Sequence, residues 1–166
     1  MTILLIIAGA VFIFILFTQD KKQVENNVLK RGGLKNIYPN FIEYIEKSNS
    51  GEVFHNLTLN ESKFEQVKED NEYLEYRTPV NSFNGDFLGY YHIGIQHTFG
   101  SFAYCYCINS YGKRIDGFLS ELHNGRDNTI KRDKEPERYR IIFSNLIRNM
   151  ENKPNFDDKF SYNIFR

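Results

Sequence analysis

The chain begins with an unbroken apolar run. Residues 2–17, TILLIIAGAVFIFILF, contain no charged side chain, and the sequence turns polar at Thr18. As a helix, residues 1–18 would be about 26 Å long, against the roughly 30 Å hydrocarbon thickness of a bilayer. The run lacks the polar face of a soluble helix, and no positive side chain precedes it as in a signal peptide. The sequence therefore predicts a transmembrane anchor over residues 1–18.

Residues 19–33 are polar and follow the apolar run directly. They are expected to continue the helix until Arg31-Gly32-Gly33, because paired glycines destabilise a helix. Positive charge follows the run at Lys21, Lys22, Lys30 and Arg31. The positive-inside rule therefore predicts a single-pass protein whose main domain lies on the cytoplasmic side.

Two later segments show helical periodicity. Pro39 suits a first helical turn, and Phe41, Ile42 and Ile45 then repeat at helical spacing. The second segment begins at Pro136, and its apolar positions form one stripe: Tyr139, Ile142, Phe143, Leu146, Ile147 and Met150. We expect this stripe to cover the apolar face of a sheet.

Strand patterns lie between the two helices. Residues 52–59 alternate, residues 72–79 end at Pro79, which forces an extended or turn conformation, and Asn84-Gly85 is a hairpin turn signal. Residues 87–109 predict a second hairpin, with His97 opposite Phe102. That register places His92 beside Cys107 and Gly94 beside Cys105, on the face opposite to the apolar one. Residues 114–124 favour a short helix, with a fifth strand as the alternative.

These elements predict an α+β fold with an antiparallel sheet of four to five strands and helices packed on one face. The globular domain is expected to span residues 34–153, with an aromatic tail over 154–166. Lys and Arg equal Asp and Glu at 21 each, which argues against a nucleic-acid partner. Abundant Asn, Lys, Ile, Phe and Tyr are typical of an AT-rich genome, and we expect a bacterial inner-membrane protein.

Candidate chemistry centres on His92, Cys105 and Cys107, which the predicted register brings together. A thiolate beside an imidazole is a minimal nucleophile pair, and Cys-x-Cys with His offers three zinc ligands. Structural zinc sites need four ligands, however, and an enzyme would also need an oriented base and an oxyanion hole. The three residues are therefore interpreted as structural, and no catalytic residue, cofactor or metal is assigned.

The second face of the predicted sheet is left for solvent or a partner. The predicted register places Tyr90, His92, Gln96 and Asn109 there, a composition common in protein interfaces. We therefore expect a non-catalytic binding module for a protein or membrane-associated partner, with the bilayer contacting residues 2–17. A toxin-neutralising immunity protein is one concrete version. A thiol- or zinc-dependent enzyme centred on Cys105, Cys107 and His92 is the alternative.

Overall fold

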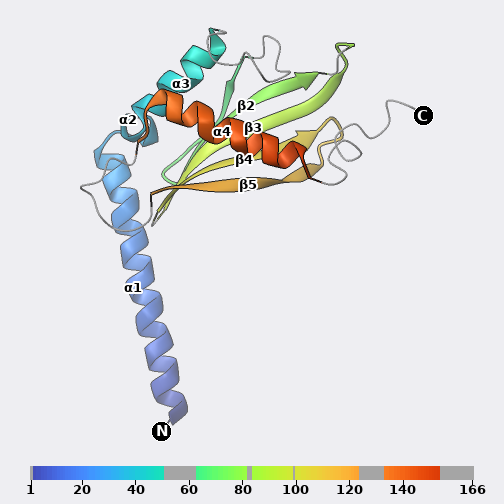
Figure 1. Cartoon of the computed structure of the whole chain (residues 1–166). Helices are drawn as coiled ribbons and strands as arrows, with labels where there is room; N and C mark the ends of the chain where they lie inside the picture. Colours follow the sequence, from blue (N-terminus) through green and yellow to red (C-terminus); the bar gives the residue numbers. More distant parts are fainter. Residues whose placement is uncertain (1, 51–62, 82–83, 99, 124–132, 154–166) are drawn as a thin grey trace.

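The protein is an α+β fold built around one antiparallel sheet (Figure 1). The computed structural model describes residues 2–50, 63–81, 84–98, 100–123 and 133–153. In these ranges the helices are α1 (Thr2–Lys30), α2 (Leu34–Ile37), α3 (Pro39–Asn49) and α4 (Pro136–Glu151). The strands are β1 (Glu65–Glu69), β2 (Tyr73–Asn81), β3 (Phe87–His97), β4 (Ser101–Asn109) and β5 (Arg114–His123), and they pair in chain order.

Helix α1 has an apolar half that projects away from the sheet and a polar half that reaches it (Figure 1). The large apolar side chains of the projecting half, from Ile6 to Phe17, are 45–68% exposed. The helix ends before Gly32 and Gly33, whose positive φ angles, 79° and 97°, confirm the predicted break. Within the described residues no helix is long and apolar enough to cross a membrane, so the structure does not support the span predicted over 1–18.

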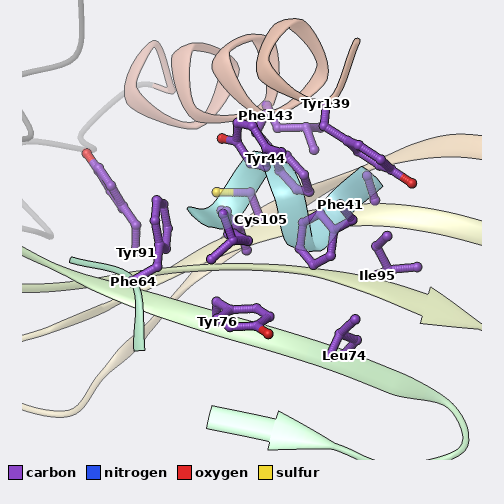
Figure 2. Packing of buried hydrophobic residues seen from close by; sticks show 14 of the residues in the cluster. Phe41, Tyr44, Phe64, Leu74, Tyr76, Tyr91, Ile95, Cys105, Tyr139 and Phe143 are labelled. Carbon is purple, nitrogen blue, oxygen red and sulfur yellow. The ribbon is translucent and has the colours of Figure 1, made fainter. Parts of the chain in front are cut away.

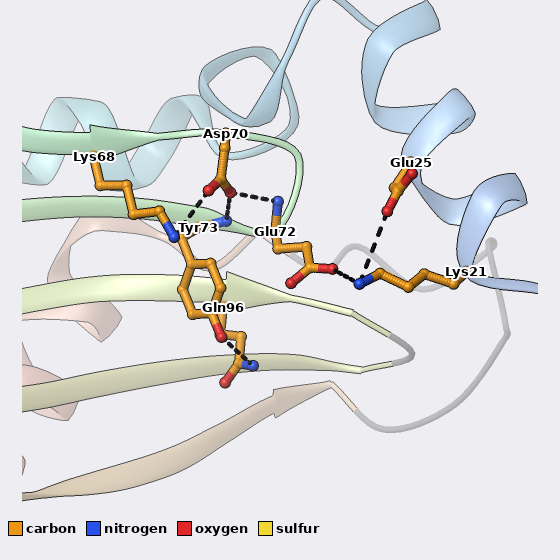
Figure 3. A network of polar contacts seen from close by, with 7 residues as sticks. All are labelled: Lys21, Glu25, Lys68, Asp70, Glu72, Tyr73 and Gln96. Atoms are coloured by element: carbon orange, nitrogen blue, oxygen red, sulfur yellow. Dashed lines mark hydrogen bonds and ion pairs between the residues drawn. The ribbon is translucent and has the colours of Figure 1, made fainter. Parts of the chain in front are cut away.

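The polar half of α1 is attached to the sheet by packing and by charge. Val28 is fully buried in the hydrophobic core. Lys21 pairs with Glu72 in the β1–β2 turn, at 2.6 Å between Nζ and Oε1, and contacts Glu25 at 4.0 Å (Figure 3). The turn itself is closed by Asp70, whose carboxylate accepts the backbone N–H groups of Glu72 and Tyr73.

The core lies between the sheet and the helices α3 and α4 (Figures 1 and 2). Both helices start with the predicted proline, and α4 buries most of the predicted stripe. Aromatic rings supply half of the buried apolar residues of these two helices, and Phe41 lies 5.3 Å from Tyr139 and 5.6 Å from Phe143 between ring centroids. The prediction that helices pack on one face of an antiparallel sheet is confirmed.

The register predicted for the β3–β4 hairpin is wrong by one residue. His97 pairs with Ser101 rather than Phe102, so Ile93 lies opposite Cys105 and His92 opposite Tyr106. This shift moves the small side chains of β4, Ala103, Cys105 and Cys107, to the face covered by the helices, where all three are buried. Small residues there leave room for the large rings of α3 and α4, and the bulky tyrosines of β4 move to the other face.

Residues 114–123 form strand β5, not the favoured helix, so the alternative is correct. The helical spacing of Ile115 and Phe118 has another cause. A bulge opposite Tyr106 adds one residue to β5: two residues separate Ile115 from Phe118, but only Tyr106 separates their partners, Cys107 and Cys105, so both contact the core. Pro79 lies inside β2 opposite Tyr90, beyond the last β1 pair. The predicted strand over 52–59 and the tail over 154–166 lie outside the described residues.

Candidate functional site: the open face of the sheet

The sheet face opposite α3 and α4 carries no described helix, and we call it the open face. The strand ladders place on it the side chains of Tyr73, Glu75, Arg77, Tyr90, His92, Gln96, Tyr104, Tyr106, Arg114 and Leu119. This set is rich in tyrosine and arginine, the residues most enriched at the energetic centres of protein interfaces.

Glu75 is the centre of a polar cluster on this face. Its carboxylate accepts hydrogen bonds from Tyr104 Oη at 2.6 Å, from Tyr106 Oη at 2.8 Å and from His92 Nδ1 at 2.8 Å. An ionised carboxylate can only accept, so His92 carries its proton on Nδ1. Glu75, His92 and Tyr104 are each at most 7% exposed, although they lie on the uncovered side of the sheet.

The cluster holds Glu75 in its charged form. Burial alone would raise the pKa of the Glu75 carboxyl, but the three hydrogen bonds outweigh burial and lower the pKa below its usual value. For Tyr104 and Tyr106, burial and the neighbouring carboxylate raise the pKa, so both hydroxyls stay protonated. The arrangement is a satisfied ion cluster, and a carboxylate already bound by three donors is a poor general base.

Gly94 makes the central hydrogen bond possible. Along the ladder it lies between Glu75 on β2 and Tyr104 on β4. A Cβ at this position would come within 2.6 Å of both the Tyr104 ring and the Leu74 carbonyl oxygen. The Tyr104 side chain therefore crosses β3 through the space that the missing Cβ leaves, and so reaches Glu75.

Three cations of the open face each lie over a tyrosine ring. Lys68 Nζ is 4.0 Å from the centroid of Tyr73, Arg77 Cζ is 4.5 Å from that of Tyr90, and Arg114 Cζ is 3.9 Å from that of Tyr106. Such cation–π contacts contribute about 0.5–1 kcal/mol each at exposed positions. They also fix the direction in which each charged group points. Figure 3 shows Lys68 beside Tyr73, whose hydroxyl accepts a hydrogen bond from Gln96.

Beside these rings the open face is hollowed. A depression of about 530 Å³ is lined by residues from all five strands. Its margin includes Lys68 from β1 and Arg114 from β5, its floor includes Tyr73 and Tyr104, and Leu119, 64% exposed, lies at the β5 side. The depression is wide and open, which suits a segment of another macromolecule better than an enclosed small molecule.

The four residues predicted to bind a partner do not stay together. Tyr90 and Gln96 are half-buried on the open face, and His92 is on the same face but buried, with its ring stacked on Tyr106 at 4.6 Å. Asn109 belongs to the β4 residues on the opposite face, together with Cys105 and Cys107. It is 5% exposed, and its Oδ1 accepts the backbone N–H groups of Tyr111 and Lys113 in the β4–β5 turn.

His92 is separated from Cys105 and Cys107 by the sheet itself. Both cysteines are free and buried on the side of the helices, whereas His92 bonds to Glu75 on the open face. Burial raises the pKa of the Cys105 thiol well above its usual value and that of Cys107 to about 12. Among the described residues no group of three His, Cys, Asp or Glu side chains is arranged to hold a metal ion.

Sequence reasoning did not identify Glu75, Tyr104, Tyr106 or Arg114 as members of the site. The sequence carries only a weak signal, because Glu75 is one of three charged residues, with Glu72 and Arg77, in the segment 72–79. Recognising its partners required the correct register of β4, since only that register turns Tyr104 and Tyr106 toward Glu75.

Comparison with known proteins adds no relative. No protein-family model matches the chain, and no curated protein and no solved structure matches it either. The functional argument therefore depends on the geometry of the open face and of α1.

Proposed function

We propose that this protein is a non-catalytic binding module that binds another protein through the open face of its sheet and is held at a membrane by the apolar half of α1. The observation that carries the binding role is the construction of the open face. Its buried charge is fully satisfied, its tyrosines and cations are fixed by mutual contacts, and a wide depression lies between them. A preorganised surface loses little side-chain entropy when a partner binds.

The membrane role is supported by the exposure of α1. Residues 6–17 are apolar on every side of the helix, and described side chains of the body leave them exposed. A helix that is apolar all round is stable when lipid or another protein surrounds it. Lys21, Lys22 and Lys30 then lie just beyond the apolar half. In a bacterial inner membrane these charges would favour a cytoplasmic position for the body.

The binding role is tested by partner capture with a matched pair of variants. The full-length protein, Leu119→Glu and Ile141→Glu are purified in mild detergent and used to capture interacting proteins from the source cells. Leu119 is 64% exposed on the open face, and Ile141 is 39% exposed on α4. We expect one partner to be captured by the wild type and by Ile141→Glu but not by Leu119→Glu. Equal capture by all three would refute binding through the open face.

The membrane role is tested by extraction at alkaline pH, which strips peripheral proteins from membranes. Ile13→Lys with Phe14→Lys places two charges in the apolar half of α1, and Gln19→Lys with Gln23→Lys adds the same charges to exposed positions in the polar half. A charge in the bilayer centre costs about 2.5–3.5 kcal/mol. The first variant should therefore be extracted while the second stays with the membrane. Extraction of the wild type would contradict the anchor.

A further inference from the structure

The three cation–tyrosine pairs of the open face differ in one respect. Lys68 also pairs with Asp70, at 2.9 Å between Nζ and Oδ2, and Arg77 with Glu65, at 3.1 Å between Nη2 and Oε2. Arg114 lies over Tyr106 in the same way, yet among the side chains that the structure describes it forms no ion pair. Among the described side chains, a carboxylate accompanies the cation and the tyrosine at Lys68 and Arg77 but not at Arg114.

Arg114 is also well placed to receive a carboxylate. Its side chain is exposed at the margin of the depression, and the contact with Tyr106 restrains the guanidinium plane. A restrained guanidinium still presents N–H donors at its edge, in the fork geometry that matches a carboxylate. Lys68, on the opposite margin of the same depression, is already paired with Asp70, and Glu75, the one acidic residue in the described lining, is covered by its three donors. Among the described lining residues, Arg114 is therefore the charged group that an occupant can pair with, and it favours an anion.

The rest of the lining indicates which other side chains the occupant carries beside its negative charge. Tyr73 and Tyr104 provide a ring surface, and Leu119, on the same strand as Arg114, exposes a large apolar side chain. We propose that the depression binds an acidic segment of the partner protein, with an Asp or Glu carboxylate on Arg114 and an apolar side chain against Leu119 and the tyrosines. This inference rests on the proposed binding function and specifies the chemistry of the partner.

The test uses a synthetic peptide of alternating Glu and Leu as the acidic probe and a Lys-Leu peptide as its counterpart. Each is titrated into the full-length protein in mild detergent, and binding is followed through the side-chain Nε–H resonances of the arginines. The variants are Arg114→Gln and Lys113→Gln. Both remove one positive charge from neighbouring, exposed residues, but Lys113 lies in the turn before β5.

We expect the Glu-Leu peptide to shift the Arg114 resonance, with the same affinity for the wild type and Lys113→Gln. Arg114→Gln should bind about tenfold more weakly, the equivalent of 1.4 kcal/mol for one lost charged contact. Equal weakening in Lys113→Gln, no response to the peptide, or tighter binding of the Lys-Leu peptide would each overturn the inference. Displacement of the peptide by inorganic phosphate or phosphatidylglycerol vesicles would also overturn it, because the site would then be one for phosphate.

The same variant separates this inference from the proposed function. If Arg114→Gln still captures the partner that Leu119→Glu loses, the open face binds a protein but Arg114 is not its carboxylate anchor. If neither Arg114→Gln nor Leu119→Glu changes capture of the partner, the proposal of binding through the open face is itself refuted.

Discussion

Removing the Tyr104 hydroxyl tests whether the Glu75 cluster stabilises the open face. In Tyr104→Phe the ring still fills the space above Gly94, but Glu75 Oε2 loses a donor that lies 2.6 Å away. Glu75 is only 7% exposed, so water replaces this donor poorly. A hydrogen bond to a buried charged group contributes about 1.5–3 kcal/mol. We therefore expect the free energy of unfolding to fall by that amount.

Thermal unfolding of the full-length protein in mild detergent provides the assay. The chain has no tryptophan, so the near-ultraviolet circular dichroism reports on tyrosine packing. For a chain of this size the expected loss lowers Tm by about 3–12 °C. The matched control is Tyr111→Phe, which removes the same hydroxyl from a ring that is 66% exposed in the β4–β5 turn. Its Tm should stay near that of the wild type.

The pH dependence gives an independent check. Because the pKa of Glu75 is lower in the folded than in the unfolded state, the unfolded state binds a proton first as the pH falls. The stabilisation is therefore complete above the ordinary carboxyl pKa and is lost as the pH falls through the folded value. The difference between the wild type and Tyr104→Phe should shrink in acid. A difference no larger than that of Tyr111→Phe at neutral pH would refute the stabilising role of the cluster.

Three further changes test other parts of the structure. Gly94→Ala should lower the free energy of unfolding by about 1–3 kcal/mol, because its Cβ would crowd the Tyr104 ring and Leu74. Gly9→Ala, inside helix α1 with nothing within 4 Å, should not lower Tm. Cys105 and Cys107 should react with a thiol reagent at pH 8 only after the protein unfolds. Rapid labelling of the folded protein would instead support the alternative hypothesis of a thiol-dependent enzyme. Asp133 accepts the Asn40 N–H at the start of α3, so Asp133→Ala should cost about 1 kcal/mol in thermal unfolding. Asp133→Asn avoids the buried charge that raises the pKa of Asp133 but keeps only one of its two acceptor oxygens, since Oδ1 also accepts a hydrogen bond from the Tyr139 hydroxyl. It should therefore lose less stability than Asp133→Ala at pH 7, and an equal loss would contradict this.

Local patterns were sufficient for the helices. Pro39 and Pro136 mark helix starts because proline fits the first turn, and paired glycines end α1 because both adopt positive φ angles. The stripe on α4 also predicted correctly which side faces the sheet. In each case the signal lies within a few residues of the feature that it predicts.

The hairpin register and β5 show where local patterns fail. Tyrosine fits either face of a sheet, because its ring is apolar and its hydroxyl is polar, so the pattern of β4 allowed two registers. The helices decided between them, since the rings of Phe41, Tyr139 and Phe143 share one buried cluster with the small residues Ala103 and Cys105. In β5 the bulge opposite Tyr106 places two core residues, Ile115 and Phe118, three positions apart, which is also the spacing of a helix.

The sequence by itself determined the α+β class, the starts of α3 and α4, the end of α1 and its long apolar run, because each depends on neighbouring residues. Only the tertiary structure decided which side chains share the open face. Glu75, Gly94 and Tyr104 come from three strands, and their contact depends on a register set by the volume of helices packed on the opposite face. The candidate site is therefore a consequence of how the core fills, and a one-residue shift in β4 would replace it with a different surface.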